Sequence, residues 1–155
     1  MQNFYKRGIT LIESLVFLAV IGILVSIILP QFSKIRENQV LKSTTGDVLS
    51  TLSKARSQTL ASINSLEYGV HFESSQVIIF KGTVFSAGAG DNEIISIVAP
   101  VVISNVTLGG ESGTSGNLYF NRLSGAPNKN GTITLSTPSI SKIITISATG
   151  VASMD

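Results

Sequence analysis

Glu13 is the residue whose type and position most clearly suggest a specific chemical role. It is the only charged residue between Arg7 and Lys34, and it lies in an otherwise apolar run of 21 residues at positions 9–29. As a helix, this run would span about 32 Å, close to the thickness of a bilayer's hydrocarbon core. A carboxylate in that setting costs several kcal/mol on insertion scales and usually has a partner. We therefore expect Glu13 to make a specific contact within or beside a membrane.

The remaining residues that could support chemistry do not form a recognisable active site. His71 is the only histidine and there is no cysteine, which excludes a disulfide framework and gives little support to a metal site or a histidine-based triad. The Asp-Asn-Glu cluster at residues 91–93 could offer oxygen ligands to calcium, but we expect a solvated turn there. Ser139 and Lys142 have Ser-x-x-Lys spacing but precede a strand-like segment. We predict no catalytic residue, no cofactor and no metal.

The elements that would position Glu13 and the rest of the chain change character along the sequence. After Pro30 the chain becomes polar but keeps helical spacing, which predicts an amphipathic helix over residues 31–66. Residues 43–46 (Ser-Thr-Thr-Gly) have low helix propensity, so they could interrupt this helix unless packing overrides the preference. The apolar stripe that should face a sheet comprises Leu41, Val48, Leu52, Ala55, Thr59, Ile63 and Leu66.

From residue 67 onward the sequence predicts β-structure. Residues 68–72 and 76–80 are strand-like segments that flank the polar turn at residues 73–75, as in a β-hairpin. Further strands are expected at residues 93–98, 101–106, 117–120, 132–135 and 142–147, with Gly-, Ser- and Asn-rich turns between them. Strands grouped after one helix favour an α+β fold, with a long N-terminal helix packed on a C-terminal antiparallel sheet domain.

The opening residues resemble the prepilin signature of the type IV pilin and pseudopilin superfamily. Lys6-Arg7-Gly8 looks like the end of that family's basic leader, and Thr-Leu-Ile-Glu follows at the start of the apolar run. The resemblance implies recognition of Lys6, Arg7 and Gly8 by a prepilin peptidase, with cleavage between Gly8 and Ile9. The resemblance also implies N-methylation of Ile9, although Ile9 stands where the family usually has Phe, a departure that weakens this expectation.

The same resemblance gives Glu13 and Pro30 their expected roles. Cleavage after Gly8 would make Glu13 the fifth residue of the mature chain, where the family's Glu pairs with the α-amino group of a neighbouring subunit during assembly. Pro30 would stand at mature position 22, where these proteins commonly kink the helix. An ordinary secretory signal fits less well, because no small-residue cleavage site follows the apolar run. A plain signal anchor would explain the basic flank but gives no reason to keep Glu13.

More of the chain resembles the GspH/FimT branch of minor pilins and pseudopilins. The helical segment at residues 52–60 is similar to a Leu-x-x-Ala-Arg-Ser run in that branch, and the strands after residue 117 follow a similar pattern. The implied organisation is a leader at 1–8, a membrane and filament-core helix at 9–30, an amphipathic helix at 31–66 and a β-rich domain at 67–155. The implied partners are other subunits, the prepilin peptidase, an inner-membrane assembly platform and the lipid bilayer.

The resemblance also implies a location and a non-enzymatic role. The chain would cross the cytoplasmic membrane once, with its N-terminus cytoplasmic and its β-rich domain outside, and then enter a type II secretion pseudopilus or a type IV pilus. Some FimT-like minor pilins bind DNA through a basic stretch near the C-terminus. Here residues 148–155 carry no basic side chain, and from residue 67 onward four bases face six acids. Because lysine and arginine supply most non-specific affinity for phosphates, this composition argues against a nucleic-acid partner.

Overall fold

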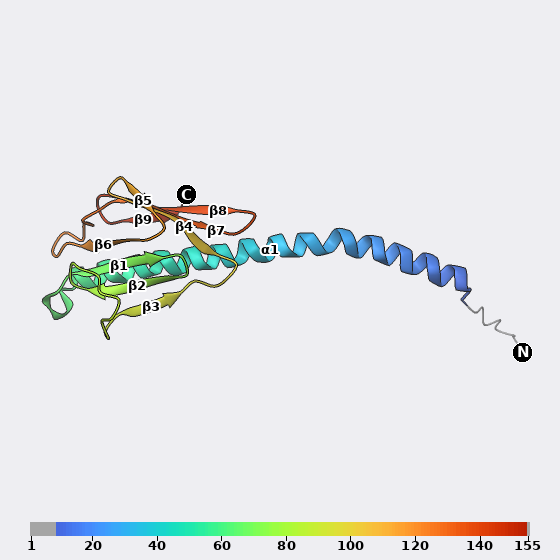
Figure 1. The fold of residues 1–155 in the computed structure, drawn as a ribbon, viewed down its shortest axis with the longest axis horizontal. Coiled ribbons are helices and arrows are strands. Elements are labelled where there is room, and N and C mark those ends of the chain that lie inside the picture. Colours follow the sequence, from blue (N-terminus) through green and yellow to red (C-terminus); the bar gives the residue numbers. More distant parts are fainter. Residues whose placement is uncertain (1–8, 155) are drawn as a thin grey trace, which may run out of the picture. The chain divides into compact units, whose positions relative to one another are not determined.

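The computed structural model describes residues 9–154, apart from the side chain of Pro30. The chain divides into two compact units, Met1–Arg36 and Glu37–Asp155, and each is described by itself. Helix α1 extends over Leu11–Leu60, so that its first part belongs to the first unit and its second part to the second (Figure 1).

The described part of the first unit is an apolar helix whose side chains have no protein covering. Leu11, Phe17 and Leu24 illustrate this, with 83%, 65% and 51% of their surface exposed. An 18-residue window in α1 has a mean hydropathy of 2.7, and no residue of that window is buried. The helix therefore includes one segment long and apolar enough to cross a membrane, which fits a membrane-anchored protein.

In the second unit α1 continues without interruption through residues 43–46, where low propensity could have broken it. Thr44 and Thr45 are buried there, and the Thr45 Oγ1 hydroxyl donates a hydrogen bond of 2.7 Å to the carbonyl oxygen of Leu41. Such a bond satisfies the buried hydroxyl within the helix itself. Burial against the sheets thus outweighs the weak propensity of these residues.

Helix α1 ends at Leu60, earlier than the apolar stripe predicts. A short 3-10 helix, η1 (Ile63–Ser65), follows, and Ser62, Asn64 and Ser65 adopt positive φ angles of 49°, 54° and 55°. These left-handed conformations turn the chain away from the helical path. Ile63 and Leu66, the last two predicted stripe positions, consequently lie outside the helix with 43% and 39% of their surface exposed.

The strands form two antiparallel sheets (Figure 1). The four-stranded sheet has the order β3-β2-β1-β6, and the five-stranded sheet has the order β5-β4-β7-β8-β9. The strands are β1 (Tyr68–Glu73), β2 (Gln76–Lys81), β3 (Glu93–Ser96), β4 (Val102–Leu108), β5 (Glu111–Gly113), β6 (Gly116–Phe120), β7 (Gly131–Ser136), β8 (Ser141–Ile146) and β9 (Ala152–Met154).

Both sheets and the second part of α1 contribute to one hydrophobic core. Leu41, Val48, Leu52 and Ala55 of the helix are at most 1% exposed. They share that core with inward-facing side chains of both sheets: Val70, Phe72, Leu118, Phe120, Ile133, Leu135, Ile144 and Ile146. The predicted α+β class, the 68–80 hairpin and the other expected strands are confirmed, whereas the short strands β5 and β9 were not predicted.

Candidate functional site

The N-terminal end of α1 is built around Thr10 and Glu13. The Thr10 Oγ1 hydroxyl accepts a hydrogen bond of 3.3 Å from the backbone N–H of Glu13, and the Thr10 carbonyl accepts one of 3.1 Å from Ser14. Thr10 therefore caps the helix, with an acidic residue three positions later as in a capping box. Glu13 lies in the first turn, where the helix dipole favours a negative charge. Sequence reasoning missed Thr10, although the Thr-x-x-Glu spacing signals this cap.

Glu13 also lines a shallow concave surface on one side of the apolar helix. The hollow has a volume of about 420 Å³ and is lined by Ile9, Glu13, Ser14, Phe17 and Leu18. Residues three or four positions apart share a helix face, so one carboxylate and one hydroxyl stand in an otherwise apolar strip. This strip can hold an apolar helix of another molecule and offer one acceptor for a positively charged group.

The structure covers the other predicted N-terminal residues only in part. Lys6, Arg7 and Gly8 lie outside the described residues. Ile9 precedes the capping residue Thr10 and has 77% of its surface exposed. Pro30 lies within α1, and its role as a kink stays a prediction.

His71 is held in a fixed environment on the outer face of β1. Its ring stacks on Phe85 with centroids 3.9 Å apart and planes inclined by 8°, and its Nε2 lies 3.4 Å from Glu73 Oε1. Burial lowers the pKa of His71, although the Glu73 carboxylate partly opposes this shift. The Nδ1 atom is buried and has no hydrogen-bond partner among the described residues.

The acidic cluster at residues 91–93 does not converge on a common point. Asp91 pairs with Lys81 at 3.1 Å, and Glu93 pairs with Lys54 of the helix. Asn92 donates through Nδ2 to the carbonyl oxygen of Ser86 at 2.8 Å. Within residues 9–154, no three His, Cys, Asp or Glu side chains come together in a way that could hold a metal ion.

Within residues 9–154, no hydrogen bond joins Ser139 to Lys142. Ser139 is exposed in the turn between β7 and β8, and Lys142 lies in β8 with Nζ 3.5 Å from the Met154 sulfur.

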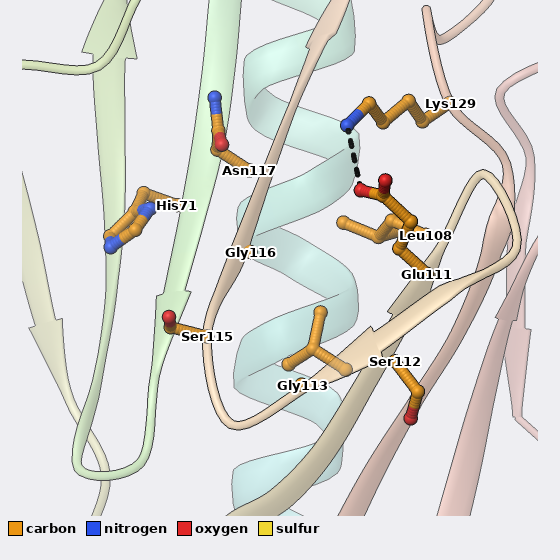
Figure 2. A pocket seen from close by; sticks show the side chains of 10 residues that line it. His71, Leu108, Glu111, Ser112, Gly113, Ser115, Gly116, Asn117 and Lys129 are labelled. Atoms are coloured by element: carbon orange, nitrogen blue, oxygen red, sulfur yellow. Dashed lines mark ion pairs between the residues drawn. The ribbon is translucent and has the colours of Figure 1, made fainter.

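A polar groove of about 320 Å³ opens where β6, at the edge of one sheet, meets β5, at the edge of the other. Figure 2 shows His71, Asn117 and Ser115 on one side, and Lys129 and Glu111 joined by an ion pair of 3.9 Å on the other. Sequence reasoning missed this groove because its residues come from β1, β4, β5, β6 and the loop before β7, and no local motif connects them.

Comparison with known families identifies only the start of the chain. Residues 3–29 match the family model described as the prokaryotic N-terminal methylation motif. This motif is found in type IV pilins and pseudopilins, so the match supports that broad superfamily and suggests a structural subunit processed by prepilin peptidase. No curated protein and no solved structure matches the chain.

Proposed function

We propose that this chain is a minor pilin or pseudopilin of GspH/FimT type, which assembles into a type II secretion pseudopilus or a type IV pilus. The observation that carries the proposal is the methylation motif at residues 3–29, which encloses Glu13 as the only charge of an exposed apolar helix. The α+β architecture after residue 37 supports it, because one helix laid on antiparallel sheets suits a subunit with an apolar stem.

Processing by prepilin peptidase would prepare the N-terminus for assembly. Lys6, Arg7 and Gly8 are the proposed recognition residues, and the cut falls between Gly8 and Ile9. The new α-amino group of Ile9 has an ordinary pKa of about 7.7–8.0, so it carries a positive charge for much of the time at neutral pH. Because Thr10 caps the helix at the next position, the mature chain would begin with an ordered helical turn.

Glu13 would then act in register selection between subunits. A lone carboxylate inside an apolar helical bundle is costly, whereas one paired with the α-amino group of a neighbouring chain is much less so. Helices packed out of register would leave the Glu13 carboxylate unpaired, and this cost favours one axial register between neighbouring subunits. The exposed strip around Glu13 supplies the apolar contacts that accompany this pair.

The proposed location and partners follow from the same organisation. Residues 9–30 would cross the cytoplasmic membrane, with the basic leader cytoplasmic in keeping with the positive-inside rule. Residues 31–66 and 67–155 would lie outside as helix and β-rich domain. The partners would be the lipid bilayer, prepilin peptidase, the inner-membrane assembly platform and other subunits that contact residues 9–30 in the filament.

The proposed processing is tested by intact mass spectrometry of the protein purified from membranes, with and without a prepilin peptidase. We expect a mass that lacks residues 1–8 only when the peptidase is present, and one extra methyl group if Ile9 is methylated. A Gly8→Leu variant provides the matched control and should remain uncut in both preparations. An uncut wild-type chain in the presence of active peptidase would favour the plain signal anchor instead.

A further inference from the structure

A second, smaller apolar cluster lies on the outer face of the four-stranded sheet. Ile78 and Phe80 of β2 are only 4% and 1% exposed, yet they are not part of the core shared with α1. Val77 and Ile79 do belong to that core, so the alternation of the strand directs Ile78 and Phe80 to the opposite face. Gly69 makes room for the Phe80 ring, which a Cβ atom at that position would overlap. Another segment must therefore cover this outer face.

The connection between β2 and β3, residues 82–92, supplies this cover, and we call it the strap. Phe85 is its only aromatic residue. The Phe85 ring packs edge-on against Phe80, with centroids 5.6 Å apart, and stacks on His71 at 3.9 Å. The strap is tied at its end by the ion pair of 3.1 Å between Asp91 and Lys81. Val84 next to Phe85 is 78% exposed, so the hold of the strap on the sheet depends on Phe85.

The hydrogen bonding of His71 suits a closed strap only while the imidazole is neutral. Nε2 lies 3.4 Å from Glu73 Oε1, which places the single N–H of the neutral ring on Nε2 and leaves Nδ1 bare. Nδ1 is buried and has no hydrogen-bond partner among the described residues. Protonation would add an N–H at Nδ1, and a buried charged donor without an acceptor is unfavourable. Water can satisfy that donor once the strap has moved away.

The surroundings of His71 offer one charge that favours its protonated form. Glu73 on the same strand attracts the proton, but burial has the larger effect and lowers the pKa of His71 below its ordinary value of 6.5. In the groove beside it, Lys129 and Glu111 lie 3.9 Å apart and balance each other. Its described neighbours from other elements are uncharged: Asn117 opposite it on β6, Ile78 opposite it on β2 and Phe85 of the strap.

We propose that residues 82–92 are an acid-opened strap: when His71 takes up a proton, Phe85 leaves the imidazole and the apolar face around Ile78 and Phe80 becomes exposed. The opening does not require unfolding, because the core shared with α1 lies on the other face of β2. Ile94 stands opposite Ile78 on β3 and is already 58% exposed, so the open form presents a broader apolar surface than the closed form. This inference does not depend on assembly into a filament.

NMR of the full chain in detergent micelles tests the proposal from about pH 8 to about pH 5. His71 is the only histidine, so ¹³C-labelled histidine gives the signals of one ring, provided that the purification tag contains no histidine. The ¹³C shift of Cε1 reports protonation, and the upfield ring-current shift of the imidazole protons reports stacking on Phe85. Phe85→Leu gives the unstacked reference, and Val84→Ala, at the exposed neighbouring position, is the matched control.

We expect the upfield shift to disappear in the same transition in which the ring is protonated, with a midpoint below 6.5 and unchanged near-UV circular dichroism. The midpoint of Phe85→Leu should move toward 6.5, and that of Val84→Ala should match the wild type. The two signals of the wild-type ring can be compared without any variant, so the test holds if Phe85→Leu fails to fold. A protonated ring that keeps its upfield shift, an upfield shift that is absent at pH 8, or loss of the stack only together with the near-UV signal would each overturn the proposal.

Discussion

Replacement of Leu52 by alanine tests how the second part of α1 packs on the sheets. Leu52 is only 1% exposed and belongs to the core shared by the helix and both sheets. Truncation removes buried methyl groups and leaves a cavity that the surrounding core closes only in part. Leucine-to-alanine changes of this kind cost about 2–5 kcal/mol. Since domains of this size are stable by about 5–15 kcal/mol, the variant should remain folded in the absence of denaturant.

Urea unfolding of the full chain in detergent micelles measures this cost. Near-UV circular dichroism of the tyrosines reports on the β-rich unit, because Tyr68 is buried at its core. With an m value of about 1–3 kcal/mol per molar urea, the expected loss moves the midpoint down by roughly 1–3 M. The m value itself should not change, because the unfolded states of both proteins expose nearly the same surface.

Leu60→Ala is the matched control on the same helix. Leu60 has 42% of its surface exposed, so its truncation removes less buried surface and should lower the free energy of unfolding by about 1 kcal/mol or less. If Leu52→Ala shifted the midpoint no further than Leu60→Ala, the helix would not bury the face that carries Leu52, and the packing described above would be wrong.

Two further predictions concern the β-rich unit. Burial lowers the pKa of His71 from its ordinary value of 6.5, so the unfolded chain binds the proton first as the pH falls. The free energy of unfolding should therefore decrease from about pH 6.5 down to the folded-state pKa. The His71→Gln variant should make the urea midpoint less sensitive to pH in this range, and an unchanged pH profile would exclude His71 as the cause. Gly150 has a φ of 82°, and a Cβ atom there would approach Gly125 O and come within 2.9 Å of Arg56 Nε, so Gly150→Ala should cost on the order of 2 kcal/mol in urea unfolding. Gly46→Ala, on an open helix surface, should instead stabilise by about 1 kcal/mol, and equal effects of the two changes would refute the steric argument.

Periodicity predicted the elements whose burial pattern is local and regular. The helical stripe through Leu41, Val48 and Leu52 follows from one buried face of the helix. Residues 77–80 are instead a continuous apolar run, as expected of a strand that is buried on both faces. The helix end was harder to predict, because Ser62, Asn64 and Ser65 turn the chain through positive φ angles that no glycine signals. The Thr59 hydroxyl, which accepts from the Tyr68 N–H at 3.0 Å, helps to hold this turn closed.

Short strands and one long-range strand pairing account for the remaining differences between sequence and structure. Strands β5 and β9 are three residues each, and their pairing partners β4 and β8 lie in the same sheet. Segments so short contain too few alternations to indicate a strand without those partners. The groove lined by His71, Asn117 and Lys129 depends on the long-range pairing of β1 with β6, whereas Glu13 stands out from its local sequence alone.

The role of Glu13 in assembly is the central claim, and filament incorporation of Glu13→Gln tests it most directly. This substitution keeps the shape of the side chain but removes its charge, and Glu67→Gln in the β-rich unit is the matched control. Immunoblots compare filaments sheared from cells with the membrane fraction. We predict that Glu13→Gln is inserted and cut as usual but falls at least about tenfold in the filament fraction, whereas Glu67→Gln assembles normally. Incorporation of Glu13→Gln at the wild-type level would contradict the account.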